Sequence, residues 1–287
     1  IVCADSRQVY RGMEIGTAKP TAAERARVPH HLIDLVDPDE AYSAGRYARD
    51  AAACLEALRA RGARALVVGG TGLYVRALLW GLCDGPTADP ALRESWLRRE
   101  QNELGVVYRR LSEVDPASAA AIHPNDLAKA LRAVEVFELT GTPLSSRQRD
   151  HGFLAPQVDA VVIGLRRERA DLYGRIDSRV DAMTAQGLVA EVEGLTRRGY
   201  GDDAPGMRAV GYRQLAGALK GAYGLDEAIR LVKRDSRRYA KRQMTWFGAD
   251  SSTHWVDASS DTPVEELVDR VTTCLEGVVC GGENRRG

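Results

Sequence analysis

The chain has 287 residues, of which 44% are hydrophobic and 28% charged. These values are typical of a globular protein and exclude a disordered or fibrous chain. Forty basic residues balance forty acidic ones, so net charge alone does not indicate a polyanionic partner. The stretch with the most apolar character, Ala65–Leu82, is interrupted by a glycine pair and Arg76, and therefore does not resemble a membrane span. The five cysteines form no C-x-x-C pair, which favours free thiols and a cytoplasmic location.

Short apolar strands alternate with helices in the first part of the chain. Ile1–Ala4 and Ala65–Val68 have the composition of buried strands. Ser43 is a candidate N-cap for a helix that continues to Ala60, and a second helix is expected over Leu73–Trp80. This alternation predicts an α/β fold with a parallel sheet.

The rest of the chain is mainly helical. Beyond a loop at 84–90, the pattern is helical from Ala91 to Arg149, and a strand follows at Val158–Leu165. These helical segments are longer than a simple crossover between two strands, so we expect them to form a separate lobe. Further helices are expected over Arg169–Arg198, Ala209–Lys220, Asp226–Phe247 and Pro263–Glu276, with a strand at His254–Val256.

The chain begins with Ile1, directly inside a strand pattern. A buried parallel strand normally follows another βα unit, so we expect a first unit to precede Ile1. The phosphate-binding motif G-x-x-x-x-G-K-[ST] does not occur in these residues. In a phosphate-using α/β enzyme this loop follows the first strand, so it would belong to that missing unit.

Polar residues follow both N-terminal strands. Asp5 and Ser6 come after the first strand, and Gly69–Gly72 come after the second. If the two strands are neighbours, Asp5 and Thr71 face the same crevice, because ligands bind beyond the carboxyl ends of parallel strands. Asp5 has two interpretations: an Asx turn that closes the strand, or a carboxylate that accepts a proton. The Gly-rich segment offers backbone N–H groups to an anion, although glycine is common in such turns.

One late helix is strongly basic. Its positive residues lie at 230, 233, 234, 237, 238, 241 and 242, and positions 230, 234, 237, 238 and 241 share a helical face. Such a face attracts nucleic-acid phosphates. The alternative is a solvated face that pairs with acidic residues between Asp257 and Asp269. Lys129 and Arg132 are spaced three apart on another helix, where surface charges are the simpler explanation.

Several blocks together resemble the tRNA dimethylallyltransferases, the tRNA isopentenyltransferase family. The residues Asp5–Pro20 carry the resemblance most clearly, and the other blocks follow in the family's order over nearly the whole chain. These are Pro29–Asp34, Tyr42–Ala44, Gly69–Tyr74, His123–Asp126, Arg132–Val136, Leu172–Asp177, Arg208–Gln214 and Ala240–Trp246. The match departs from the family in lacking the N-terminal phosphate loop. A C-terminal zinc-finger extension is absent as well, which favours the bacterial branch.

The resemblance implies a fold and a domain organisation. The fold is an α/β class with a P-loop kinase-like parallel sheet core and a helical insertion lobe. Residues 1–90 and 155–276 would form the core, 91–154 the tRNA-binding insertion, and 277–287 a disordered tail.

The resemblance also implies an activity. The family transfers a dimethylallyl group from dimethylallyl diphosphate to N6 of the adenosine directly 3′ of the tRNA anticodon. Asp5 would be the catalytic base and Thr71 a second catalytic residue, with Gly69, Gly70, Thr71 and Gly72 at the diphosphate. Contacts to tRNA are implied for Asp5, Ser6, Arg7, Gln8, Arg93, Ala128, Lys129, Ala130, Leu131, Arg132, Arg208, Ala209, Val210, Gly211, Tyr212, Arg213, Ser236, Arg237, Arg238, Tyr239, Ala240, Lys241, Arg242 and Gln243.

The implied partners are the tRNA anticodon stem–loop and dimethylallyl diphosphate. The protein is expected to be a monomer. Mg²⁺ is the expected cofactor, with its main ligands in the missing N-terminal segment, and no metal ligand is assigned in this chain. Two alternatives stay open. One is an adenylate isopentenyltransferase acting on AMP or ADP, and the other is an inactive fragment that binds tRNA without the phosphate loop.

Overall fold

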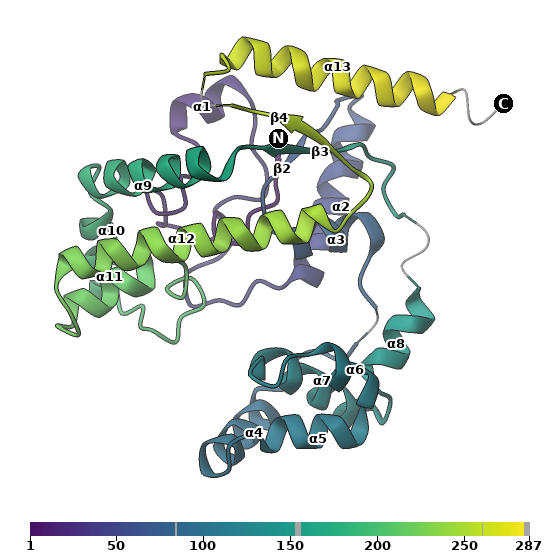
Figure 1. Cartoon of the computed structure of the whole chain (residues 1–287), viewed down its shortest axis with the longest axis vertical. Coiled ribbons are helices and arrows are strands. Elements are labelled where there is room, and N and C mark those ends of the chain that lie inside the picture. Colours follow the sequence, from purple (N-terminus) through teal and green to yellow (C-terminus); the bar gives the residue numbers. More distant parts are fainter. Residues whose placement is uncertain (84, 153–155, 260, 284–287) are drawn as a thin grey trace. The chain divides into compact units, whose positions relative to one another are not determined.

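The computed structural model describes residues 1–83, 85–152, 156–259 and 261–283 (Figure 1). The chain divides into two compact units. The first comprises residues 1–79 and 158–287, and the second residues 80–157. The sequence predicted an insertion over 91–154, a range that falls within the second unit.

The first unit contains two short parallel sheets. Strand β1 (Val2–Cys3) pairs with β2 (Val67–Val68), and β3 (Val162–Arg166) pairs with β4 (Thr253–Asp257). The pairing is parallel in both sheets, as the alternation of strands and helices predicts. Strands and helices together make the α/β class of the chain.

Strand β2 differs from its prediction as a buried strand. Leu66, Val67 and Val68 are 63%, 39% and 53% exposed. Among the described residues β2 has only β1 as a strand neighbour, so its other edge is uncovered. The apolar pattern predicted the strand correctly, but apolar side chains are buried only where another element packs on them.

Helices surround these sheets, and most of them match their predicted ranges. Helix α2 begins at the predicted cap, where Ser43 Oγ accepts the N–H of Arg46. The single helix expected over 169–198 is divided at Gly187, whose φ of +105° favours glycine. The helices of this unit are α1 (Ala22–Arg27), α2 (Ala44–Ala60), α3 (Gly72–Trp80), α9 (Arg169–Ala185), α10 (Leu188–Arg197), α11 (Tyr212–Leu219), α12 (Leu225–Gly248) and α13 (Val264–Glu283).

Two segments differ from expectation. Helix α1 was missed, although Thr21 and Glu24 form a capping box whose T-x-x-E spacing is visible in the sequence. Helix α13 continues to Glu283, whereas a disordered tail was predicted from residue 277. Residues 284–287 of that tail lie outside the described residues.

The core of the first unit forms where β1 meets the helices. Val2, Val9 and Met13 are fully buried with Tyr47 of α2 and Tyr212 of α11. The Tyr47 ring stacks on the ring of Tyr74 at a centroid distance of 4.2 Å. This packing fixes the chain on both sides of the carboxyl end of β1.

The described residues of the second unit form helices joined by loops, with no strand among them. Its core includes Val107, Leu111 and Val134, which are fully buried. Asp115 and Asp126 cap two of its helices by accepting backbone N–H bonds, so helix boundaries fall at both positions. The helices are α4 (Pro90–Asn102), α5 (Val106–Val114), α6 (Pro116–Ala121), α7 (Leu127–Thr140) and α8 (Leu144–His151).

Candidate active site

Asp5 lies directly after β1 and closes the strand with an Asx turn. Its Oδ1 accepts the N–H of Arg7 at 2.7 Å and that of Gln8 at 3.4 Å. No described residue donates to Oδ2. The structure therefore shows the Asx turn, and it leaves the second oxygen open to a ligand, as the other interpretation of Asp5 requires.

The Gly-rich segment after β2 reaches the same place. The N–H of Ser6 donates to Thr71 Oγ1 at 3.0 Å, and the N–H of Thr71 donates to the carbonyl of Ala4 at 3.2 Å. A Cβ at Gly69 would lie 2.3 Å from the Ala4 carbonyl, so only glycine permits this approach. The turn that contains Asp5 and the segment that contains Thr71 therefore lie side by side after the two paired strands, as the sequence predicts for neighbouring strands.

Helix α12 packs on this segment through its second half. Gln243 Nε2 donates to the carbonyl of Gly70 at 2.9 Å, and the Tyr239 hydroxyl approaches the same oxygen at 3.5 Å. A Cβ at Gly72 would lie 2.3 Å from the Trp246 indole. The Gly-rich segment is therefore held between β1 and α12.

A cleft of about 790 Å³ opens beside Asp5. Helices α9 and α12, which run side by side (Figure 1), and the 208–213 segment form much of its wall. Asp5 and Asp235 are its only carboxylates among the described residues. Seven arginines line it: Arg7, Arg179, Arg208, Arg213, Arg234, Arg238 and Arg242.

Asp235 organises part of this arginine cluster. Its carboxylate accepts Gln214 Nε2 at 2.8 Å and Arg234 Nε at 2.9 Å, and Arg213 and Arg238 approach it at 3.4 and 3.5 Å. Hydrogen bonds from Arg234 and Gln214 hold the pKa of Asp235 below its usual value. Three guanidinium groups are thereby fixed at the cleft.

Arg179 and Arg208 differ from those three arginines. Neither makes a hydrogen bond or an ion pair with another described residue. Both side chains are exposed, so their donors are free to bind an anion.

Only part of the basic face predicted on α12 lines the cleft. Arg234, Arg238 and Arg242 line the cleft, at spacings of four. Arg237 instead pairs with Asp177 of α9 at 2.6 Å, and Arg230 pairs with Glu227. The alternative, pairing with the acidic residues 257–269, is not found in the described residues either; the partners lie on α9 and on α12 itself.

Some residues in the implied tRNA-binding set have buried side chains. Ala209 and Tyr212 belong to the core of the first unit, and Ala130 and Leu131 to that of the second. The hydroxyl of Tyr212 donates to Glu191 at 2.5 Å, so it is not available to RNA. The side chains of these four residues pack in the two cores, so any contact of these positions with tRNA would come from the backbone.

In the second unit, Arg93 and Arg132 converge on Glu135. The Glu135 side chain is fully buried and receives two hydrogen bonds from Arg93 and one from Arg132, at 2.5–2.8 Å. Lys129 pairs with Asp126 at the start of α7 and is 72% exposed. Ala128 is exposed as well.

Sequence reasoning missed three residues of the site. Arg179 and Asp235 line the cleft, and Glu191 binds the 14–16 segment beside it. The charge of Arg179 was visible in the sequence, but its facing the cleft depends on the packing of α9 against α12. No local pattern signals the partners of Asp235 or Glu191.

Among the described residues, no helix is both long and apolar enough to cross a membrane. Cys3, Cys54 and Cys274 form no disulfide bond. Burial raises the pKa of the Cys3 thiol to about 11, so it is protonated at neutral pH.

An arginine-lined cleft at the carboxyl ends of parallel strands, with an open carboxylate oxygen on its wall, defines an α/β protein that binds phosphate-rich ligands. A family model described as IPP transferase matches residues 8–250. The chain belongs to this family, as its sequence motifs predict.

Named relatives agree with the family model. The chain is 51% identical over 260 residues to "tRNA dimethylallyltransferase 2" of Geotalea uraniireducens, covering 90% of this chain and 83% of that protein. It is 51% identical over 259 residues to "tRNA dimethylallyltransferase" of Desulfosudis oleivorans, covering 90% and 82%.

Solved structures agree as well. A tRNA isopentenylpyrophosphate transferase of Bacillus halodurans matches with a TM-score of 0.71 and 38% identity, over 99% of this chain and 89% of that one. A eukaryotic dimethylallyltransferase acting on tRNA matches with a TM-score of 0.76 and 26% identity, over 90% and 67%.

Proposed function

We propose that this chain transfers a dimethylallyl group from dimethylallyl diphosphate to N6 of an adenosine in tRNA, releasing diphosphate. The acceptor would be the adenosine directly 3′ of the anticodon. The observation that carries this proposal is the position of Asp5 on an arginine-lined cleft, with Thr71 hydrogen-bonded to the residue that follows Asp5. The names of the relatives describe the same reaction.

Asp5 is the proposed base. The exocyclic amine of adenine is a weak nucleophile, so a carboxylate that accepts its proton as the C–N bond forms lowers the barrier. Oδ2 is free to take this proton, while the Arg7 and Gln8 amides hold Oδ1 in place. The target base must leave its stack to reach this oxygen.

The Gly-rich segment is the proposed site of the donor's diphosphate end. The diphosphate leaves as an anion, and fixed N–H dipoles and hydroxyl groups stabilise it as its charge develops. Gly69–Gly72 precede and open α3, at whose N-terminus such an anion is favoured. Thr71 links this segment to the residue after Asp5, which supports a role for both in one reaction.

The arginines of the cleft are the proposed contacts for tRNA. Guanidinium groups bind phosphate through paired donors, and they also stack on bases that are splayed out of a loop. Arg208, Arg213, Arg238 and Arg242 belong to the sequence blocks that imply tRNA contact. We extend the proposal to Arg93, Lys129 and Arg132 of the second unit, as ligands of the anticodon stem–loop bound by one monomer.

The proposed core is of the P-loop kinase-like type. The parallel pairing of β1 with β2 and of β3 with β4 is consistent with such a core. The location of Asp5 and Thr71 at the carboxyl ends of strands also supports it, because doubly wound α/β folds bind ligands there.

Mg²⁺ is proposed as a cofactor that enters bound to the diphosphate of the donor. Among the described residues, no group of three or more His, Cys, Asp or Glu side chains could hold a metal ion. The oxygens near the Gly-rich segment are the Ser6 and Thr71 hydroxyls, 3.3 Å apart, and the Asp5 carboxylate. Mg²⁺ needs few protein ligands beside phosphate oxygens and water, so it would enter bound to the diphosphate and lie next to these oxygens.

The test is incubation with unmodified tRNA, Mg²⁺ and dimethylallyl diphosphate, followed by mass spectrometry of the nucleosides. N6-dimethylallyl-adenosine from tRNA, formed much more slowly by the Asp5→Asn variant, is the expected result. Product from AMP but not from tRNA would replace this proposal with an adenylate isopentenyltransferase. Binding of tRNA with no product from either acceptor would indicate an RNA-binding protein.

A further inference from the structure

The carboxylate of Glu191, in the first turn of α10, accepts four hydrogen bonds. Three come from consecutive backbone N–H groups: Glu14 and Ile15 donate to Oε2 at 2.9 and 2.8 Å, and Gly16 donates to Oε1 at 3.2 Å. The fourth comes from the Tyr212 hydroxyl at 2.5 Å. One side chain of α10 therefore satisfies a run of backbone donors that lies more than 170 residues away in the sequence.

Tyr212 packs against the same segment. It is fully buried, and a Cβ at Gly16 would lie 2.5 Å from its ring. Burial and the nearby Glu191 charge raise the pKa of the Tyr212 phenol, so it stays a donor to the carboxylate. Because residue 16 is glycine, its backbone can contact the Tyr212 ring while its N–H donates to Glu191.

The segment held by Glu191 leads to the catalytic turn. The carbonyls of Thr17 and Ala18 accept Gln8 Nε2 at 3.1 and 3.3 Å. The N–H of Gln8 in turn approaches Asp5 Oδ1. A chain of hydrogen bonds thus runs from Glu191 through residues 14–18 and Gln8 to Asp5, while Gly16 and Thr17 also line the cleft.

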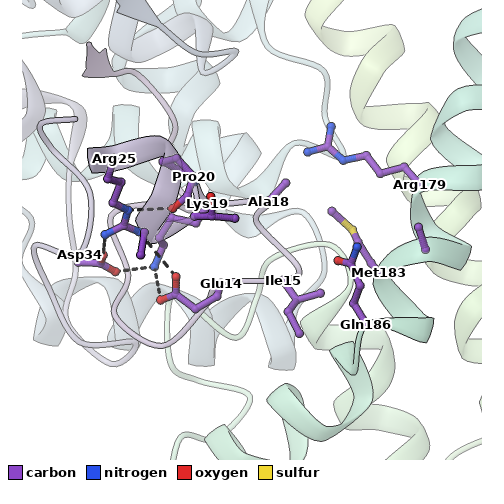
Figure 2. Close-up of a pocket in the computed structure, with 13 residues that line it drawn as sticks. Glu14, Ile15, Ala18, Lys19, Pro20, Arg25, Asp34, Arg179, Met183 and Gln186 are labelled. Carbon is purple, nitrogen blue, oxygen red and sulfur yellow. Dashed lines mark hydrogen bonds and ion pairs between the residues drawn. The ribbon is translucent and has the colours of Figure 1, made fainter. Parts of the chain in front are cut away.

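The far end of the segment is fixed by a second charged group. The buried ammonium of Lys19 donates to the Tyr10 carbonyl, to Glu14 and to Asp34, at 2.7, 3.0 and 2.5 Å. Figure 2 shows this cluster on one side of a pocket, with Met183 and Gln186 on the other. Because Lys19 holds both its own position and the side chain of Glu14, loss of Glu191 would loosen the backbone between them and not the whole loop.

We propose that Glu191 is a positioning residue, which holds residues 14–18 so that Gln8 keeps Asp5 in its reactive orientation. The inference rests on the proposed transfer reaction, because it assigns Glu191 to the orientation of the base. Glu191 touches neither substrate in this account. Its loss should lower turnover without weakening tRNA binding.

The variants are Glu191→Ala, Glu191→Gln and Tyr212→Phe, with Glu193→Ala as the matched control. Glu193 lies on the same helix and is exposed, and among the described residues it pairs only with Arg197, at 3.9 Å. For each variant we would measure kcat, both KM values, the thermal midpoint, and hydrogen–deuterium exchange of the amides of residues 6–8 and 14–18.

We expect Glu191→Ala to lower kcat by about 10- to 100-fold, the effect of a misplaced catalytic group, with KM for tRNA within about twofold of wild type. Exchange should rise in both segments. Glu191→Gln should fall between wild type and the alanine variant, because its carbonyl still accepts two amides while its NH₂ group cannot accept the third. Glu193→Ala should match wild type.

Two results would overturn the inference. One is a Glu191→Ala protein that is folded at the assay temperature and keeps the wild-type kcat. The other is faster exchange confined to residues 14–16, with residues 6–8 unchanged, since the proposed connection would then be absent. If the wild-type protein itself forms no product, the transfer function fails, and the exchange at residues 6–8 still decides whether Glu191 controls the Asp5 turn.

Discussion

The backbone N–H of Ser6 donates to the hydroxyl of Thr71 at 3.0 Å. This bond joins the turn after β1 to the Gly-rich segment after β2, across 65 positions of the sequence. It holds the proposed base and the proposed diphosphate site next to each other. Displacement of either segment would therefore alter the distance between the two reacting groups.

Asp5→Asn should abolish most of the transfer activity while the fold is retained. The asparagine carbonyl can still accept the Arg7 N–H and keep the turn, but an amide cannot take the proton of the adenine amine. We expect kcat to fall by about 10²- to 10⁴-fold. Single-turnover kinetics with saturating tRNA measures this.

The control for Asp5→Asn is Asp202→Asn, an exposed residue that pairs with Lys220. A wild-type rate in Asp5→Asn would remove Asp5 from the mechanism. A loss of tRNA affinity as large as the loss of rate would instead indicate that Asp5 binds RNA.

Thr71→Val and Thr71→Ser separate the hydroxyl from the side-chain shape. Valine has a shape similar to threonine but leaves the Ser6 N–H without its acceptor, at a cost of about 1 kcal/mol. We expect it to lower kcat by about 10²-fold, as for other removed donors at a developing anion. Serine keeps the hydroxyl and should stay near the wild-type rate. Equal rates for the two variants, by nucleoside mass spectrometry, would contradict the role of the hydroxyl.

Arg238→Gln should weaken tRNA binding more than Arg230→Gln does, although both residues lie on α12. Arg238 lines the cleft, whereas Arg230 pairs with Glu227 outside it. Loss of one phosphate contact should reduce the slope of log K against log salt by about 0.7. Filter binding of the anticodon stem–loop at several salt concentrations tests this. Equal slopes for both variants would mean that the cleft is not the RNA surface.

Glu135→Ala should destabilise the second unit. The variant leaves the Arg93 and Arg132 guanidinium groups without their shared carboxylate and the N–H of Asp89 without its acceptor. Because both arginines are partly exposed, we expect a loss of roughly 3 kcal/mol in the free energy of unfolding. Urea unfolding followed by circular dichroism measures it. Glu94→Ala, an exposed residue on α4, is the control and should change little.

The second unit should also lose stability in acid. Asp115 is buried, and hydrogen bonds from Ser118 and Ser145 hold its pKa below the usual value despite its burial. A lowered pKa in the folded state gives stability that is complete above about pH 3.9, the unfolded pKa, and is lost as pH falls through the folded pKa. The free energy of unfolding should therefore decline in this acidic range.

Asp115→Asn tests the source of that decline. The variant should be less stable at neutral pH, and its stability should depend less steeply on pH below about pH 4. Lowered pKa values of Asp126 and Glu135 will leave part of the slope in place. A slope identical to wild type would show that Asp115 does not titrate with folding.

The sequence by itself determined the strand ends and the residues on them. An apolar strand followed by Asp5, and a second one followed by Gly69–Gly72, are local patterns, and parallel strands bring such ends to one edge. The N-cap at Ser43 and the helical composition of 91–149 are local as well. Short-range steric and hydrogen-bonding preferences suffice for features of this kind, and the motifs built on them identified the family.

The tertiary structure alone decided which charged groups meet. The basic character of α12 was visible in the sequence, but the direction in which each basic side chain faces was not. Arg237 and Lys233 form ion pairs with Asp177 and Asp181 of α9. Arg234, Arg238 and Arg242 line the cleft instead. Glu191 likewise finds its backbone donors only when α10 packs against residues 14–16. A charged group takes the partner that the packed fold brings within hydrogen-bond distance, and residues distant in the chain leave no periodic signal of that pairing.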